Sequence, residues 1–148
     1  MPSHFTLRMQ FGPHQDPADI GEQLLRLVRE APVDEVMVFF FAEEQNDGHD
    51  PLDRVQQWID RSRPWRAALR TAGVQISLNP WHSLLHTDRG RRLKPGQTWQ
   101  PLVDPAGREA NAVVCFLDPE WRRYFFETLR RYAREGFPVS ELIAYYWQ

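Results

Sequence analysis

Side chains suited to binding a sugar are concentrated between positions 79 and 117 of this 148-residue chain. They are Asn79, Trp81, His82, His86, Asp88 and Arg89, followed by Lys94, Trp99 and Asp104. An aromatic ring stacks on the apolar C–H face of a sugar, while carboxylate, amide and imidazole groups hydrogen-bond its hydroxyls. We therefore predict that this segment binds carbohydrate, with packing of Trp81 and Trp99 against the protein as the alternative.

Two predicted ligands of the sugar each have a second interpretation. Glu43 follows a continuous apolar run, where its carboxylate could contact a substrate hydroxyl or cap the loop before Asp50. Asn79 can both donate and accept hydrogen bonds, yet Asn-Pro is also a common turn. We include Glu43 and Asn79 in the predicted binding cleft.

His82 and His86 lie four positions apart, which is the spacing of two metal ligands on one face of a helix. A zinc site needs at least a third ligand, and no glutamate follows His82 as it does in a metalloprotease helix. We predict that these histidines hydrogen-bond to the substrate. Asp88 and Arg89 could pair with each other, or Arg89 could bind a carboxylate of the substrate. Neither a metal nor a cofactor is expected.

Three segments have the residue pattern of β-strands. Phe5 to Phe11 alternates apolar and polar residues, which is typical of a strand with one buried face. Val33 to Phe41 contains a continuous apolar run, 36–41, which is typical of a parallel strand covered on both faces. Val74 to Leu78 predicts a third strand.

Three Asp-Pro pairs predict helix starts, because Asp accepts hydrogen bonds from free backbone N–H groups and Pro fits the first turn. The pairs are Asp16-Pro17, Asp50-Pro51 and Asp118-Pro119, and apolar residues follow each of them at helical spacing. Pro64 should kink or restart the second helix. Gly73 and Gly136 should end the second and third helices, and Phe137-Pro138-Val139 should begin a fourth strand.

The alternation of strands and helices predicts an α/β fold with a parallel sheet, either an open doubly wound sheet or part of a (β/α)8 barrel. The segment 11–16 after the first strand has one glycine, and the chain holds no Walker sequence, so a nucleotide-binding sheet is disfavoured. Polar residues instead follow strands two and three, where a barrel builds its active site. We predict a partial (β/α)8 TIM barrel comprising the first three to four β/α units.

Composition restricts the functional classes. With 42% apolar and 26% charged residues, the chain can bury one core, and its formal charge of −2 gives no general attraction to nucleic acid. No apolar run approaches the roughly 20 residues that span a membrane. Cys115 is the only cysteine, expected to be a buried, inert thiol, and the cytoplasm is the expected location.

Several segments together resemble the amino-terminal half of bacterial (β/α)8-barrel glycoside hydrolases related to β-galactosidases. The segments are Ile76-Ser-Leu-Asn-Pro-Trp-His-Ser-Leu-Leu-His-Thr-Asp-Arg-Gly-Arg91, Asp104-Pro-Ala-Gly-Arg-Glu-Ala110 and Leu117-Asp-Pro-Glu-Trp-Arg122. The resemblance covers nearly everything before about Val139. It implies a barrel that hydrolyses O-glycosyl bonds with two carboxylates, a proton donor and a nucleophile, near the ends of strands four and seven.

The sequence departs from that family at positions 137–148, where strand four should run into an acidic end. A full barrel needs typically about 250 residues. We therefore expect residues 1–148 to form a single incomplete catalytic-barrel-like domain with a non-native tail, inactive alone, that binds carbohydrate and either self-associates or joins a missing C-terminal half.

Two alternative functions remain open. The first is a metal-dependent sugar isomerase or epimerase barrel, in which histidines and carboxylates would hold a divalent cation. The second is a non-catalytic half-barrel that binds a partner through its open strand edges. A rise in melting temperature with Mn²⁺ or Mg²⁺ would favour the first, and concentration-dependent assembly without sugar binding would favour the second.

Overall fold

The computed structural model describes residues 4–41, 48–80 and 92–137 of the chain. Its elements, in chain order, are β1 (Thr6–Phe11), α1 (Pro17–Glu30), β2 (Glu35–Phe40), α3 (Leu52–Thr71), β3 (Gln75–Leu78), β4 (Pro101–Val103), β5 (Glu109–Val114) and α4 (Pro119–Arg134). The predicted α/β class is confirmed, because strands and helices alternate from β1 to β3. Phe137 lies outside any strand, and the rest of the predicted fourth strand is outside the described residues.

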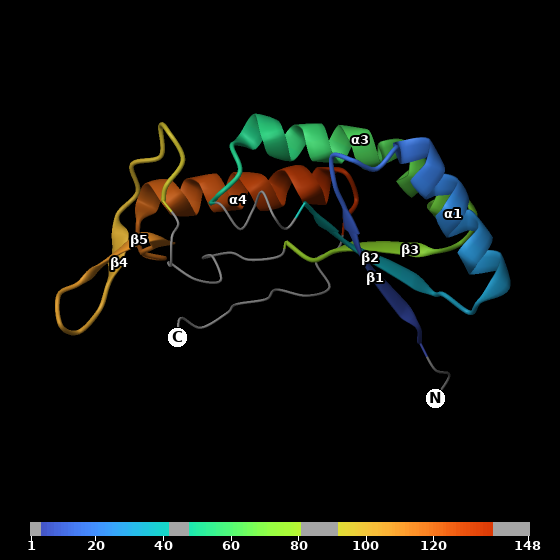
Figure 1. The fold of residues 1–148 in the computed structure, drawn as a ribbon, viewed down its shortest axis with the longest axis horizontal. Coiled ribbons are helices and arrows are strands. Elements are labelled where there is room, and N and C mark those ends of the chain that lie inside the picture. The colour runs from blue at the N-terminus through green and yellow to red at the C-terminus, as the bar shows by residue number, and fades with distance from the viewer. Residues whose placement is uncertain (1–3, 42–47, 81–91, 138–148) are drawn as a thin grey trace.

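A three-stranded parallel sheet forms the centre of the fold. Its strands stand in the order β1-β2-β3, so each strand pairs with its neighbour in the sequence. The register places Leu7 beside Val36 and Val36 beside Ile76. Figure 1 shows α1 and α3 together on one side of this sheet, as right-handed crossovers between successive parallel strands require.

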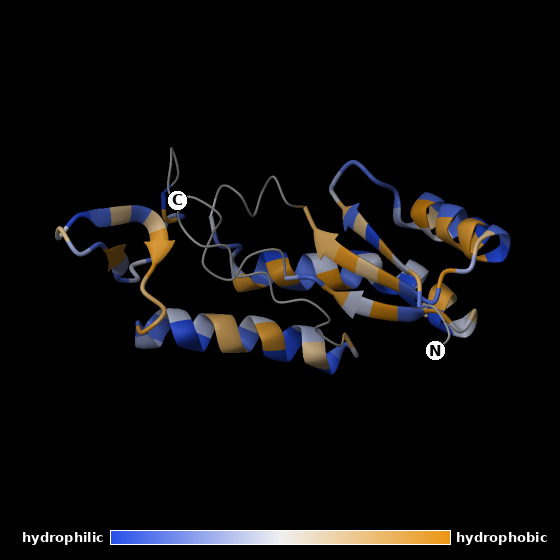
Figure 2. Ribbon diagram, turned by 90° about the horizontal axis from the view of Figure 1, so that it is seen from below, coloured by the Kyte–Doolittle hydropathy of each residue, from blue (hydrophilic) through white to orange (hydrophobic). Residues whose placement is uncertain are grey.

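The core lies between the sheet and the helices. Phe11 and Phe40, which are register partners at the ends of β1 and β2, both contact Trp58 of α3, at ring distances of 6.2 Å. Tyr132 of α4 stacks on Phe40 at 5.9 Å. Because these rings come from two strands and two helices, their burial fixes the helices against the sheet. Figure 2 shows the alternation of apolar and polar residues along α1 and α4 that this packing needs.

Gly21 permits the close approach of α1 to α3. A Cβ atom at this position would lie 3.1 Å from the Cβ of Trp65, which is fully buried. Any side chain larger than hydrogen would therefore push the two helices apart. The sequence pattern predicts both helices but does not indicate this contact.

Two of the three predicted Asp-Pro caps are confirmed. The Asp16 carboxylate accepts hydrogen bonds from the backbone N–H groups of Ala18 and Asp19. Asp118 accepts from Glu120 and Trp121 and also from the backbone N–H of Gln100, at 2.7 Å, so it joins the preceding segment to α4. These hydrogen bonds, that from Gln100 first, hold the pKa of the Asp118 carboxyl below its ordinary value.

The predicted cap at Asp50 is wrong. The helix begins at Leu52, which leaves Pro51 in the capping position without a side-chain hydrogen bond. The Asp50 carboxylate is buried and instead forms an ion pair with the Lys94 ammonium group at 2.8 Å. An Asp one residue too far from the helix cannot reach the free N–H groups.

Three other predictions need correction. Of the two effects predicted for Pro64, a restart of the helix is excluded, since α3 runs continuously from Leu52 to Thr71, and a kink stays a prediction. The segment 79–117, where we predict no strand, contains β4 and β5, which form an antiparallel hairpin. Cys115 is half-buried and not fully enclosed.

The predicted helix ends at Gly73 and Gly136 are confirmed. Both glycines lie just beyond a helix with positive φ angles of 81° and 71°. Within the ranges that the structure describes, no helix is long and apolar enough to cross a membrane.

Candidate functional site

Of the side chains predicted to bind a sugar, the structure describes Lys94, Trp99 and Asp104, and also Asn79. Asn79 follows β3 at the carboxyl edge of the sheet, it is buried, and its backbone N–H donates to the carbonyl of Val38 at 2.9 Å. The other predicted ligands, Glu43, Trp81, His82, His86, Asp88 and Arg89, lie outside the described residues. Their assembly into one cleft therefore stays a prediction.

A hollow at the carboxyl ends of β1 and β2 forms the candidate site, which we call the edge pocket. It has a volume of about 400 Å³ and is lined by Gln10, Gly12, Pro13, His14, Gln15 and Phe41. His14 is exposed, whereas Gln10, Gln15 and Phe41 are half-buried. The pocket thus combines two amide side chains, an imidazole and an aromatic ring.

The loop after β1 is held in place by hydrogen bonds within the loop and from α3. The backbone N–H of Gly12 donates to the side-chain oxygen of Gln15 at 2.7 Å. Arg61 of α3 donates to the carbonyls of Pro13 and Gln15, at 3.3 and 3.1 Å, and its guanidinium lies over the Phe11 ring. The pocket wall is therefore fixed before any ligand arrives.

Gly12 keeps the edge pocket open. A Cβ atom there would lie 3.4 Å from the Phe41 ring and 3.8 Å from the side-chain nitrogen of Gln10. A side chain at this position would occupy the space between the ring and the amide. Because the oxygen of Gln15 is held by Gly12, the Gln15 side chain presents its NH₂ group as a donor.

A second polar group, the His49 cluster, lies where the segments before α3 and before β4 meet the start of α4. Rings of Trp99, Trp121 and Tyr124 surround His49 at centroid distances of 5.2, 6.3 and 5.8 Å. The Tyr124 hydroxyl donates to the carbonyl of Asp50 at 2.7 Å, and the Gln97 amide donates to the carbonyl of His49 at 2.9 Å. Trp99, one of the residues predicted to stack on a sugar or to pack, here packs.

Burial controls the ionisation of the His49 cluster. It lowers the pKa of His49 to about 3, with a smaller contribution from the nearby Lys94 charge, so the imidazole is neutral at physiological pH. Burial, and next the Asp50 charge, raises the pKa of Tyr124. A neutral, enclosed histidine of this kind contributes to structure.

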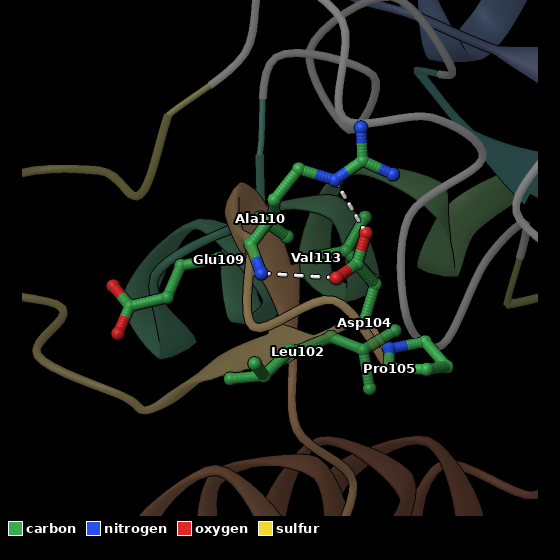
Figure 3. A pocket seen from close by; sticks show the side chains of 8 residues that line it. Leu102, Asp104, Pro105, Glu109, Ala110 and Val113 are labelled. Carbon is green, nitrogen blue, oxygen red and sulfur yellow. Dashed lines mark hydrogen bonds and ion pairs between the residues drawn. The ribbon is translucent and has the colours of Figure 1, made fainter.

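A second hollow, of about 390 Å³, lies on the β4–β5 hairpin (Figure 3). Its walls are mainly apolar, from Leu102, Val103, Pro105, Ala110 and Val113. The Asp104 carboxylate accepts hydrogen bonds from the backbone N–H groups of Ala106 and Arg108 and from the Arg108 guanidinium, so it stabilises the turn. Arg108 and Glu109 also line the hollow, but it lies on the hairpin and not at the carboxyl edge of the parallel sheet.

Among the described residues no group of three or more His, Cys, Asp or Glu side chains could hold a metal ion. No family model, no curated protein and no solved structure matches this chain. Its function must therefore be argued from its own residues.

The residues of the edge pocket carry a weak sequence signal. Gln10 belongs to the alternating strand pattern. His14 lies in a loop with one glycine, which disfavours a nucleotide-binding site and indicates no other ligand. His49 lies between Gly48 and Asp50 with no periodic pattern around it. The position of Gln10 and His14 just before and after the end of a parallel strand was the one signal that could have identified them.

Proposed function

We propose that this chain supplies the first β/α units of a (β/α)8 barrel of the glycoside hydrolase type and that its carboxyl edge binds carbohydrate. The sequential order of β1, β2 and β3 supports a barrel, as does the packing of α1 against α3 on one side of the sheet. O-glycosyl bond hydrolysis by the complete barrel requires two carboxylates, and the proposal assigns neither to the described residues.

The observation that carries the proposal is the composition of the edge pocket. Phe41 offers a ring face for the C–H groups of a sugar, while the side chains of Gln10, His14 and Gln15 offer donors and acceptors for its hydroxyls. The pocket lies at the ends of parallel strands, which is where barrel enzymes bind their substrates.

The test is calorimetric titration of the chain with methyl β-D-galactopyranoside and methyl β-D-glucopyranoside. We expect His14→Ala and Gln10→Ala each to weaken binding about fivefold, because each removes a hydrogen bond worth about 1 kcal/mol. Gln56→Ala, on the exposed side of α3, is the matched control and should leave affinity unchanged. Absence of binding, or equal affinity of all variants, would overturn the proposal.

A further inference from the structure

The outer face of α4 carries charges of alternating sign. Glu120, Arg123, Glu127 and Arg130 are spaced three, four and three residues apart, which places them on one stripe of the helix. Within the chain Arg123 pairs with Glu120 and Arg130 pairs with Glu127. The side chains of Glu120 and Arg123 remain 62% and 70% exposed, so most of their hydrogen-bonding surface faces solvent.

An aromatic side chain and a hollow lie beside this stripe. Phe126 is 53% exposed. The hollow beside it has a volume of about 590 Å³. Its lining residues, which include the four charged residues, are Leu52, Trp99, Glu120, Arg123, Tyr124, Phe126, Glu127 and Arg130.

The charge order identifies the partner. When two copies of α4 lie antiparallel with the two-fold axis beside residue 125, Glu120 of one copy faces Arg130 of the other. In the same register Arg123 faces Glu127, so every charge on the stripe meets its opposite. A parallel pair would instead place like charges together.

We propose that this stripe of α4 is a self-complementary interface through which two copies of the chain form an antiparallel, two-fold symmetric dimer. Two-fold interfaces use the same patch on both subunits, as this one does. A helix of 16 residues is about 24 Å long, so the contact is small and the dimer is expected to dissociate in the micromolar range or above. The proposal does not depend on sugar binding.

The test is sedimentation equilibrium of the full chain and of two charge-reversed variants, alone and mixed. Glu120→Arg places like charges opposite each other at both ends of the dimer, and Arg130→Glu does the same. Each variant alone should self-associate at least tenfold more weakly than the unchanged chain. An equimolar mixture should recover the association, because Arg at 120 in one variant then faces Glu at 130 in the other.

Two controls separate this interface from loss of folding and from other surfaces. Circular dichroism should show that both variants keep their helix content, since the altered residues are exposed. Asp53→Arg, on the exposed first turn of α3, should leave the association unchanged. A monomeric unchanged chain at millimolar concentration, or a mixture no more associated than its components, would overturn the proposal.

Discussion

His49 is a buried residue whose pKa lies well below its ordinary value. The surrounding rings of Trp99, Trp121 and Tyr124 exclude water, so protonation would place a charge in an apolar enclosure. The neighbouring Lys94 ammonium group opposes protonation further. When the pH falls low enough to protonate His49 in the unfolded chain but not in the fold, the unfolded state gains stability relative to the fold.

The stability of the chain should fall between pH 6.5 and pH 5. Here the folded pKa of His49 is lowered, to about 3, so in this window the unfolded state binds the proton and the folded state does not. At pH 5 the free energy of unfolding should be lower than at pH 7 by about 2 kcal/mol. Urea unfolding at the two pH values measures this difference.

His49→Gln is the control for that measurement. It removes the titrating group, so the loss of stability between pH 7 and pH 5 should largely disappear even where the variant is less stable overall. If the wild-type chain were equally stable at both pH values, the pKa of His49 would not be lowered in the fold. The lowered pKa values of Asp104 and Asp118 affect stability only in more acidic solution.

The role of a single residue can be predicted from the sequence when its hydrogen-bond partners are its neighbours in the chain. Asp16 and Asp118 cap helices because the residue that follows each of them is the first helical residue. Asp50 has the same Asp-Pro sequence, but its helix starts one residue later. Its carboxylate forms an ion pair with Lys94, which is distant in the chain. No local pattern encodes such a partner.

The C-terminus of α4 is joined to α3 by a buried guanidinium. Arg66 donates to the carbonyls of Ile59 and Glu135, at 3.0 and 3.3 Å, and to the Ser62 hydroxyl at 3.0 Å. Its guanidinium also lies 4.2 Å from the centre of the Phe137 ring. Burial lowers the pKa of Arg66, while the Glu135 carboxylate opposes this effect.

Arg66→Met should lower the free energy of unfolding by about 3 kcal/mol, because it removes buried hydrogen bonds to the Ile59 carbonyl and the Ser62 hydroxyl and one cationic partner of the Glu135 carboxylate. Arg70→Met is the matched control. Arg70 donates to the carbonyls of Glu135 and Gly136 from an exposed position, so its loss should cost about 1 kcal/mol or less. Urea unfolding measures both, and equal effects would contradict the role assigned to Arg66.

Among the elements, hydrophobic periodicity predicts the helices and strands that bury one face. The helices and the parallel strands were predicted because their apolar residues recur at fixed spacing. The hairpin was missed because Pro101–Val103 is short and Glu109–Val114 mixes Glu, Asn and Ala with two valines, which gives a weak strand pattern. Its pairing depends on contacts between the strands.

At the scale of the whole molecule, the order β1-β2-β3 with helices on one side agrees with the predicted parallel sheet. Closure into a barrel stays a proposal, as does the assembly of the predicted sugar ligands. The edge pocket could not be predicted as a unit, because it combines Gln10 of β1 and the loop after β1 with Phe41 after β2, and their proximity follows from sheet register.

The most direct test of the central claim is a ¹H–¹⁵N NMR titration of the labelled chain with methyl β-D-galactopyranoside. We expect the amide signals of Gly12, His14, Gln15 and Asn79 to shift with a common saturation curve, while those of the hairpin, such as Gly107, stay in place. Shifts confined to the hairpin, or no shift at saturating sugar, would contradict a carbohydrate site at the carboxyl edge of the sheet.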